Sequence, residues 1–271
     1  MWQGSIGSFH SKDHDVTELS TTLTHKIPGG IMTQPTLEMY PTSISKLGAR
    51  RWATQMIIGT VFFGTILFLS AGRLNWVEGW VYLALNTITQ IISAIVLTSR
   101  NPDLLTERSS VGKGTKSWDQ SLSVAVAVFA PLAIMITGGL NARFQPTTAY
   151  GSDVWTFGII LAFLCQMFVL WAMASNPFFA LTVRIQDERG HRVVHSGPYR
   201  LIRHPGYLGS VLFTLLCPLV LGSSWVVVPA LLSCILIIIR TSLEDAALQA
   251  ELPGYREYES KVRWRLFPGI W

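Results

Sequence analysis

The side chains best suited to chemistry gather in two polar stretches of the chain. Residues 184–207 read RIQDERGHRVVHSGPYRLIRHPGY, and residues 240–271 read RTSLEDAALQAELPGYREYESKVRWRLFPGIW. They flank a long apolar run, His204–Ile239. If this run folds back on itself, the two stretches meet. Their guanidinium, imidazole and carboxylate groups then form one site, with a polar side and an apolar side.

Arg240 and Glu244 are spaced so that they share one face of a helix. In a ligand site, the guanidinium could hold an anion and the carboxylate could pair with an ammonium group. The same spacing is also expected of an ion pair at a helix end, with Arg240 reaching toward lipid headgroups. Asp245 points about 100° away on such a helix, and we expect it to be solvated.

The segment before the apolar run allows similar alternatives. Arg200, Arg203 and His204 precede Pro205, so the chain there is expected to be extended or turning. These residues suit either a ligand site or contact with lipid headgroups. Tyr199 and Tyr207 could equally be aromatic residues of the membrane interface.

His191 and His195 are four residues apart, a spacing that can bind metal on a helix. They lie on a stretch that contains Gly190, Gly197 and Pro198, where this spacing has no helical meaning. We therefore expect no metal site.

Composition indicates the elements that must position these groups. Of 271 residues, 49% are hydrophobic and only 14% are charged, whereas a soluble domain is about 25% charged. This excludes an ordinary soluble enzyme, a disordered protein and a fibrous protein. The chain is expected to be a polytopic membrane protein.

Uncharged runs locate the membrane segments, since a spanning helix needs about 20 apolar residues. Such runs lie at 52–72, 79–98, 120–142, 154–183 and 204–239. Asn176-Pro177 is expected to end the fourth helix early. Pro218 and Gly222-Ser223-Ser224 divide the last run into a hairpin of two short helices, each of about 17 residues. The prediction is an all-α integral membrane protein with about six transmembrane helices, or five if the hairpin is shallow.

Loop charges orient this topology. With six crossings and a cytosolic N-terminus, only Arg73 and Arg143 of the 21 basic residues face outside. Both termini are then cytosolic. The net charge of +5 is explained by orientation and by contact with anionic membrane lipids, so we expect no nucleic-acid partner. Residues 1–50, rich in Ser, Thr, Pro and Gly, are expected to form a flexible cytosolic tail.

An ordered set of motifs carries a family resemblance. NPDLLTER (101–108), Asn176-Pro177, GPYRLIRHPGYLG (197–209), an apolar hairpin, Arg-x3-Glu-Asp (240–245) and a final Tyr-x2-Tyr pair follow one another. Together they resemble the isoprenylcysteine carboxyl methyltransferase and phospholipid methyltransferase superfamily, over residues 99–271 and most strongly over 176–271.

The resemblance implies an all-helical, membrane-bound methyltransferase that uses S-adenosyl-L-methionine and has no Rossmann domain. Residues 51–140 would hold the first three transmembrane helices, and 141–271 a methyltransferase core with helices 4–6 and cytosolic cofactor-binding segments. Arg240 would face the carboxylate of the methyl acceptor. The cofactor-binding residues carried over are Gln186, His191, Arg192, Val193, Val194, Tyr199, His204, Pro205, Gly206, Tyr207 and Glu244. Residues 187–195 align only with a gap, and Asp245 stands where relatives often have a second Glu.

Residue chemistry favours an anionic acceptor. A carboxylate is ionised near pH 7 and needs no general base, and Arg240 could hold it in a fixed geometry. An amine acceptor would instead need a base, for which Glu244, His204 or Asp245 are candidates. The expected function is carboxyl O-methylation of a lipid-like acceptor, such as a prenylated cysteine, that enters from the bilayer.

Other functions stay open from the sequence. One is methylation of a phospholipid amine or of a small apolar acid or thiol. Another is an NADPH-dependent membrane reductase, because VRWRLFPGIW and Arg-His-Pro-x-Tyr are also similar to the C-terminal part of sterol reductases. A non-catalytic membrane scaffold is the last. The expected location is the endoplasmic reticulum of a eukaryote or the inner membrane of a bacterium.

Overall fold

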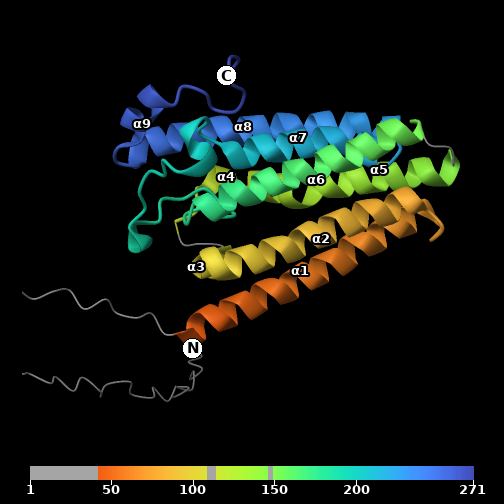
Figure 1. Cartoon of the computed structure of the whole chain (residues 1–271), viewed down its shortest axis with the longest axis horizontal. Coiled ribbons are helices and arrows are strands. Elements are labelled where there is room, and N and C mark those ends of the chain that lie inside the picture. Colours follow the sequence, from red (N-terminus) through yellow and green to blue (C-terminus); the bar gives the residue numbers. More distant parts are fainter. Residues whose placement is uncertain (1–41, 109–113, 146–148) are drawn as a thin grey trace, which may run out of the picture. The chain divides into compact units, whose positions relative to one another are not determined.

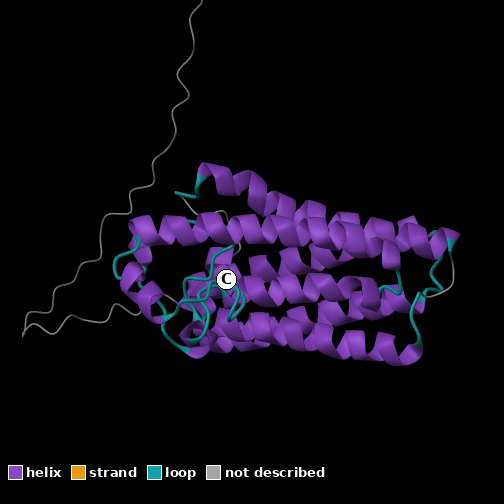
Figure 2. Ribbon diagram, turned by 90° about the horizontal axis from the view of Figure 1, so that it is seen from above, coloured by secondary structure: helices purple, strands orange, loops and turns teal. Residues whose placement is uncertain are grey.

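The computed structural model describes residues 42–108, 114–145 and 149–271. Within these ranges the secondary structure is entirely helical (Figures 1 and 2). The longer helices are α1 (Thr42–Ala71), α2 (Val77–Arg100), α5 (Ala130–Phe144), α6 (Ser152–Ser175), α7 (Pro205–Val220) and α8 (Val227–Glu251). Shorter ones are α3 (Pro102–Arg108), α4 (Ser117–Val124) and α9 (Tyr255–Lys261), and a π-helical segment, η1 (Ala125–Phe129), joins α4 to α5.

Six apolar helical segments in the described ranges match the predicted runs. Five are long and apolar enough to cross a membrane: Arg50–Ala71, Val77–Arg100, Ser117–Phe144, Ser152–Ser175 and Ser224–Glu251. The sixth, α7, is apolar but has only 16 residues. The predicted all-α integral membrane fold is confirmed. Helix α6 ends at Ser175, directly before Asn176-Pro177, as the steric restriction on a residue before proline predicts.

The hairpin differs from the prediction in the length of its second helix. The turn falls at Gly222, which has a positive φ of 64°, and α7 has nearly the expected length. Helix α8, however, has 25 residues and continues through Arg240 to Glu251. Residues 240–251 are rich in Leu, Ala, Glu and Gln, which are strong helix formers. Arg240 and Glu244 are therefore within a helix and not at its end.

The first helix also begins earlier than predicted. Helix α1 starts at Thr42, so residues 42–50 extend the first apolar helix and do not belong to a tail. The rest of the predicted tail, residues 1–41, lies outside the described residues.

Small residues allow the long helices to pack closely. A methyl group added at Gly139 of α5 would lie 2.6 Å from Cβ of Ser70 and 2.8 Å from the carbonyl oxygen of Leu67 on α1. A methyl group at Gly209 of α7 would lie 2.6 Å from Val169 on α6. Close helix approach at small residues is typical of membrane bundles.

The chain connections separate two ends of the bundle. Helices α3 and α9 and the segment 176–204 lie at one end, and the α1–α2 and α7–α8 connections lie at the other (Figure 1). At this second end, Arg143 packs against Gly72, and Gly72 directly precedes Arg73 in the chain. The two arginines predicted to lie apart from the other basic residues are thus together, at the end opposite to α9.

Candidate functional site

The segment between α6 and α7, residues 176–204, folds across the end of the bundle. The side-chain oxygen of Asn176 accepts a hydrogen bond from the backbone N–H of Phe178 at 2.8 Å, which turns the chain directly after α6. The amide nitrogen of Asn176 donates to the Tyr199 hydroxyl at 3.2 Å. Gly197 has a φ of 57°, and a methyl group there would lie 2.3 Å from Oγ of Ser175. Only glycine fits this position.

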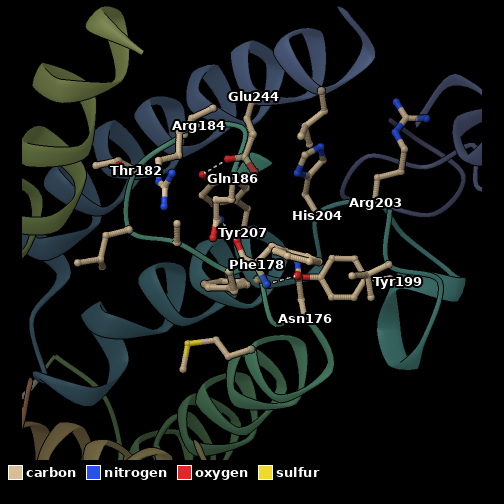
Figure 3. A pocket seen from close by; sticks show the side chains of 18 of the residues that line it. Asn176, Phe178, Thr182, Arg184, Gln186, Tyr199, Arg203, His204, Tyr207 and Glu244 are labelled. Carbon is tan, nitrogen blue, oxygen red and sulfur yellow. Dashed lines mark hydrogen bonds between the residues drawn. The ribbon is translucent and has the colours of Figure 1, made fainter. Parts of the chain in front are cut away.

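This segment closes a cavity of about 340 Å³, which is in the size range of small-molecule sites (Figure 3). The lining comes from α3, η1, α6, α7, α8, α9 and residues 176–204. Eleven residues carried over from the resemblance line it: Gln186, His191, Arg192, Val193, Val194, Tyr199, His204, Gly206, Tyr207, Arg240 and Glu244. Pro205 does not line it; it occupies the first position of α7, where a missing N–H costs nothing.

Tyr207 and Glu244 join the two polar stretches. The Tyr207 hydroxyl donates a hydrogen bond to the Glu244 carboxylate at 2.5 Å (Figure 3). Both side chains are partly exposed to the cavity. The hairpin of α7 and α8 thus brings residues far apart in the sequence into one site, as predicted.

An aromatic wall forms on one side of the cavity. The rings of Phe178 and His191 lie 4.6 Å apart at an angle of 35°. The backbone N–H of Gln186 donates to Nδ1 of His191 at 3.3 Å, so this nitrogen is an acceptor. Burial lowers the pKa of His191 to about 4, and the imidazole is therefore neutral at pH 7. His195 instead packs edge-on against the ring of Tyr258.

Arg240 pairs with a carboxylate that the sequence did not suggest. Its Nε and Nη2 donate to the two oxygens of Asp119 on α4, at 2.7 and 3.1 Å. Asp119 is fully buried and also accepts from the backbone N–H of Val183 at 2.6 Å. Arg240 also donates to the carbonyl oxygen of Leu181 at 2.7 Å. The alternative of an ion pair with Glu244 at a helix end is therefore wrong, and Arg240 is held inside the bundle.

Asp245 is fully buried, which contradicts the prediction of a solvated side chain. Arg203 binds it with two nitrogens at 2.9 and 3.0 Å, and Nε2 of His204 lies 3.0 Å from its Oδ1. Tyr255 and Arg265 donate to it at 2.7 and 2.8 Å. The helical period placed Asp245 on a different face from Arg240 and Glu244, but it did not show what covers that face. Residues 203–204, directly before α7, and the C-terminal segment cover it.

This cluster explains the position of the Arg-His-Pro motif. The backbone N–H groups of Arg203 and His204 donate to the carbonyl oxygens of Trp264 and Arg265, at 2.9 and 3.0 Å. Arg203 is only 5% exposed, so the alternative of contact with lipid headgroups is wrong for this residue. Burial, and then the charge of Asp245, raise the pKa of Tyr255, which therefore stays protonated and donates.

Several lining residues were not among the predicted site residues. Arg184 is buried and bonds to Glu107 of α3 at 2.9 Å and to Glu188 at 2.7 Å. Arg108, the last residue of α3, lies over the ring of Phe179 at 5.6 Å. The NPDLLTER motif that contains Glu107 and Arg108 was the available signal. For Asp119 the sequence offered only its place at the start of an apolar run.

The fold defines an all-α integral membrane protein, and the described residues enclose a cavity of small-molecule size at one end of its helix bundle. Residues 158–250 match the Isoprenylcysteine carboxyl methyltransferase (ICMT) family, a family of methyltransferases, which confirms the resemblance drawn from the motifs. The matched segment runs from α6 to the end of α8 and contains Tyr207, Arg240 and Glu244. A comparison with curated proteins finds no match.

Proposed function

We propose that the protein is an S-adenosyl-L-methionine-dependent membrane methyltransferase that esterifies the carboxylate of a lipid-like acceptor, such as a prenylated cysteine. The observation that carries the proposal is the Tyr207–Glu244 contact: both residues belong to the segment that matches the family, and both line the cavity. It joins the two polar stretches on which the motif depends.

The residues present fit S-adenosyl-L-methionine. This ligand has an ammonium group, a carboxylate, a sulfonium and an adenine ring. Glu244 supplies a negative charge for the ammonium group, and the faces of Phe178, His191 and Tyr207 suit an aromatic ring or a cation. The proposed cofactor-binding residues are the ten of the eleven carried over from the resemblance that line the cavity; Pro205 instead shapes the start of α7, and Arg240 serves the acceptor. When bound, the cofactor supplies an electrophilic methyl group on a positively charged sulfur.

The protein's own groups then act by position and charge. An acceptor carboxylate is ionised at neutral pH, so no residue has to remove a proton. Arg240 is fixed by Asp119 and Leu181, and it lies over the ring of Tyr207 at 5.6 Å. A fixed guanidinium beside the reacting oxygen orients the acceptor and costs no reorganisation. The apolar lining from Val126, Val169 and Met173 excludes water and suits a hydrocarbon chain.

One observation favours a second candidate, methylation of an amine such as that of a phospholipid. Asp245 orients the imidazole of His204, a cavity-lining residue, at 3.0 Å. A histidine oriented by a carboxylate is the usual form of a general base, which an amine acceptor requires. The family match gives no support to the NADPH-dependent reductase.

The proposal includes an orientation in the membrane. The end of the bundle with α3 and α9 faces the cytosol, because Arg73 and Arg143 lie at the opposite end. The membrane is that of the endoplasmic reticulum or the bacterial inner membrane, and the acceptor reaches the cavity from the bilayer.

The test uses the full chain in detergent with methyl-tritiated S-adenosyl-L-methionine. Incubation with N-acetyl-S-farnesylcysteine should give a labelled product that releases volatile methanol in base, as a methyl ester does. Phosphatidylethanolamine as acceptor gives a base-stable label if the protein is an amine methyltransferase. Binding of NADPH without binding of S-adenosyl-L-methionine would overturn both methyltransferase proposals.

A further inference from the structure

The arginines around the cavity differ in how their charge is compensated. Five of them line it, and Arg192 is exposed to solvent. Arg184, Arg203 and Arg240 are buried, and each bonds to a carboxylate of the protein. Arg108 is partly buried, but no ion pair among the described residues includes it. Its polar contact is a long hydrogen bond of 3.4 Å from Nη1 to the carbonyl oxygen of Phe179.

This arrangement leaves a positive charge on the wall of the cavity. Burial, and then the nearby charge of Arg240, together lower the pKa of Arg108 to about 10. Arg108 is nevertheless cationic at neutral pH. Asp119 neutralises only one of the two guanidinium groups, and it bonds to Arg240. A bound anion would therefore relieve both the desolvation of Arg108 and its repulsion from Arg240.

The position of Arg108 indicates which anion this is. Its partner Phe179 packs against an apolar cluster at the ends of the membrane helices: Trp52, Leu97, Leu104, Leu105, Leu170 and Met173. The opposite part of the lining, with Val193, Leu252, Tyr255 and Tyr258, belongs to a separate cluster that includes α9. Arg108 thus lies on the side of the cavity that is next to the membrane helices. An acceptor whose hydrocarbon chain lies among these helices would place its polar head beside Arg108.

We propose that Arg108 binds the carboxylate of the methyl acceptor, together with Arg240. This inference rests on the proposed function and names a residue that fixes its substrate class. Arg108 and Arg240 share one bonded carboxylate, that of Asp119, while Glu244 of the same cavity is assigned to the ammonium group of the cofactor. The pair of guanidinium groups is therefore a site for a single negative charge. A neutral amine or thiol acceptor would leave Arg108 uncompensated, so the site selects an anionic head on an apolar chain.

The first experiment compares Arg108→Gln, Arg108→Lys and a control, Arg100→Gln, in detergent-purified full chain. Arg100 is exposed in the last turn of α2 and does not line the cavity. In Arg108→Gln, KM for N-acetyl-S-farnesylcysteine should rise at least tenfold, while Kd for S-adenosyl-L-methionine changes less than twofold. Arg108→Lys should give an intermediate KM, because lysine keeps the charge but not the two-point geometry. The control should match the wild type.

The second experiment tests charge selection without depending on turnover. N-acetyl-S-farnesylcysteine and its C-terminal carboxamide are compared by competition for binding. The wild type should bind the acid at least tenfold more tightly than the amide, and Arg108→Gln should lose this preference. If Arg108→Gln does not fold, the acid-to-amide ratio of Arg108→Lys must still fall below that of the wild type.

Three results would overturn the inference. An unchanged KM and acid preference in folded Arg108→Gln would show that Arg108 does not bind the acceptor. A large loss of affinity for S-adenosyl-L-methionine would assign Arg108 to the carboxylate of the cofactor. An equal affinity of the wild type for acid and amide would exclude an anion site. Failure of the proposed function differs from all three, since the wild type would then transfer no methyl group to the acid.

Discussion

Replacement of Asp245 by asparagine tests whether this carboxylate holds the site together. Asp245 is fully buried and accepts from Arg203, Tyr255 and Arg265 at 2.7–3.0 Å. Asparagine keeps the shape of the side chain, so Asp245→Asn removes the charge without leaving a cavity. Because Arg203 is only 5% exposed, water cannot replace the lost charge.

The magnitude follows from the burial of both partners. Removal of one partner of a buried ion pair costs about 3–5 kcal/mol. Asparagine retains one acceptor oxygen for Tyr255 or Arg203, so we expect the lower end, about 3 kcal/mol. For a chain of this size each kcal/mol lowers the melting temperature by about 2–4 °C. The expected decrease is therefore about 6–12 °C.

The assay is thermal unfolding of the full chain in detergent, followed by size-exclusion chromatography. Glu259→Gln is the matched control, because Glu259 also accepts from Arg203, at 3.2 Å, but its side chain is 32% exposed. Because the Glu259 carboxylate is partly exposed to water, we expect its replacement to cost less than that of Asp245, about 1 kcal/mol. If Asp245→Asn melts within about 2 °C of the wild type, Asp245 is solvated and the described cluster does not hold α7 and α8 together.

Three further predictions concern the cavity. Glu244→Gln should weaken S-adenosyl-L-methionine binding at least tenfold in calorimetry, because the ammonium group loses its counter-charge; unchanged affinity would contradict this role. Arg240→Lys should lower methyl transfer at least tenfold while Kd for the cofactor stays within a few-fold, since lysine cannot make the two-point contact with Asp119; a matching loss of cofactor affinity would argue against it. Burial keeps the pKa of His191 near 4 in the folded chain, below its unfolded value of about 6.5. Stability should therefore be greatest above pH 6.5 and fall as the pH decreases toward 4, because the unfolded state takes up the proton first. His191→Gln should flatten the melting-temperature profile between pH 6.5 and 5, and a profile as steep as that of the wild type would refute the assignment.

The features that depend on local sequence were predicted well. Uncharged runs found the apolar helices, and Asn176-Pro177 gave the end of α6. Gly222 gave the turn of the hairpin, because a positive φ needs glycine. Of the twelve site residues that the motifs suggested, eleven line the cavity and Pro205 does not. Each of these is a property of a short segment, or of an ordered motif, and requires no knowledge of which helices are neighbours.

The partners of the buried charges could not be predicted in the same way. Arg240 and Asp119 are separated by 121 positions in the chain, and neither an apolar run nor a helical period relates them. Asp245 was expected to be solvated because it points about 100° away from Arg240 and Glu244, yet Arg203, His204 and the C-terminal segment cover that face. Long-range pairing of charges depends on which helices are neighbours and on how they are rotated. Hydropathy predicts that the helices pack together, but not in which arrangement.

Charge compensation separates Arg203 and Arg240, which hold the fold whatever else they bind, from Arg108, which is proposed only to bind the substrate. Arg203 and Arg240 are buried with carboxylates at 2.9 and 2.7 Å, so their substitution removes a buried partner of Asp245 or Asp119 and destabilises the bundle. Arg108 has no such partner among the described residues, so its removal relieves repulsion from Arg240 and leaves no carboxylate behind. Arg108→Gln should therefore keep or raise the melting temperature while it weakens acceptor binding. A residue whose removal stabilises the protein but impairs substrate binding is retained for its ligand. If Arg108 had a purely structural role, its removal would instead lower the melting temperature.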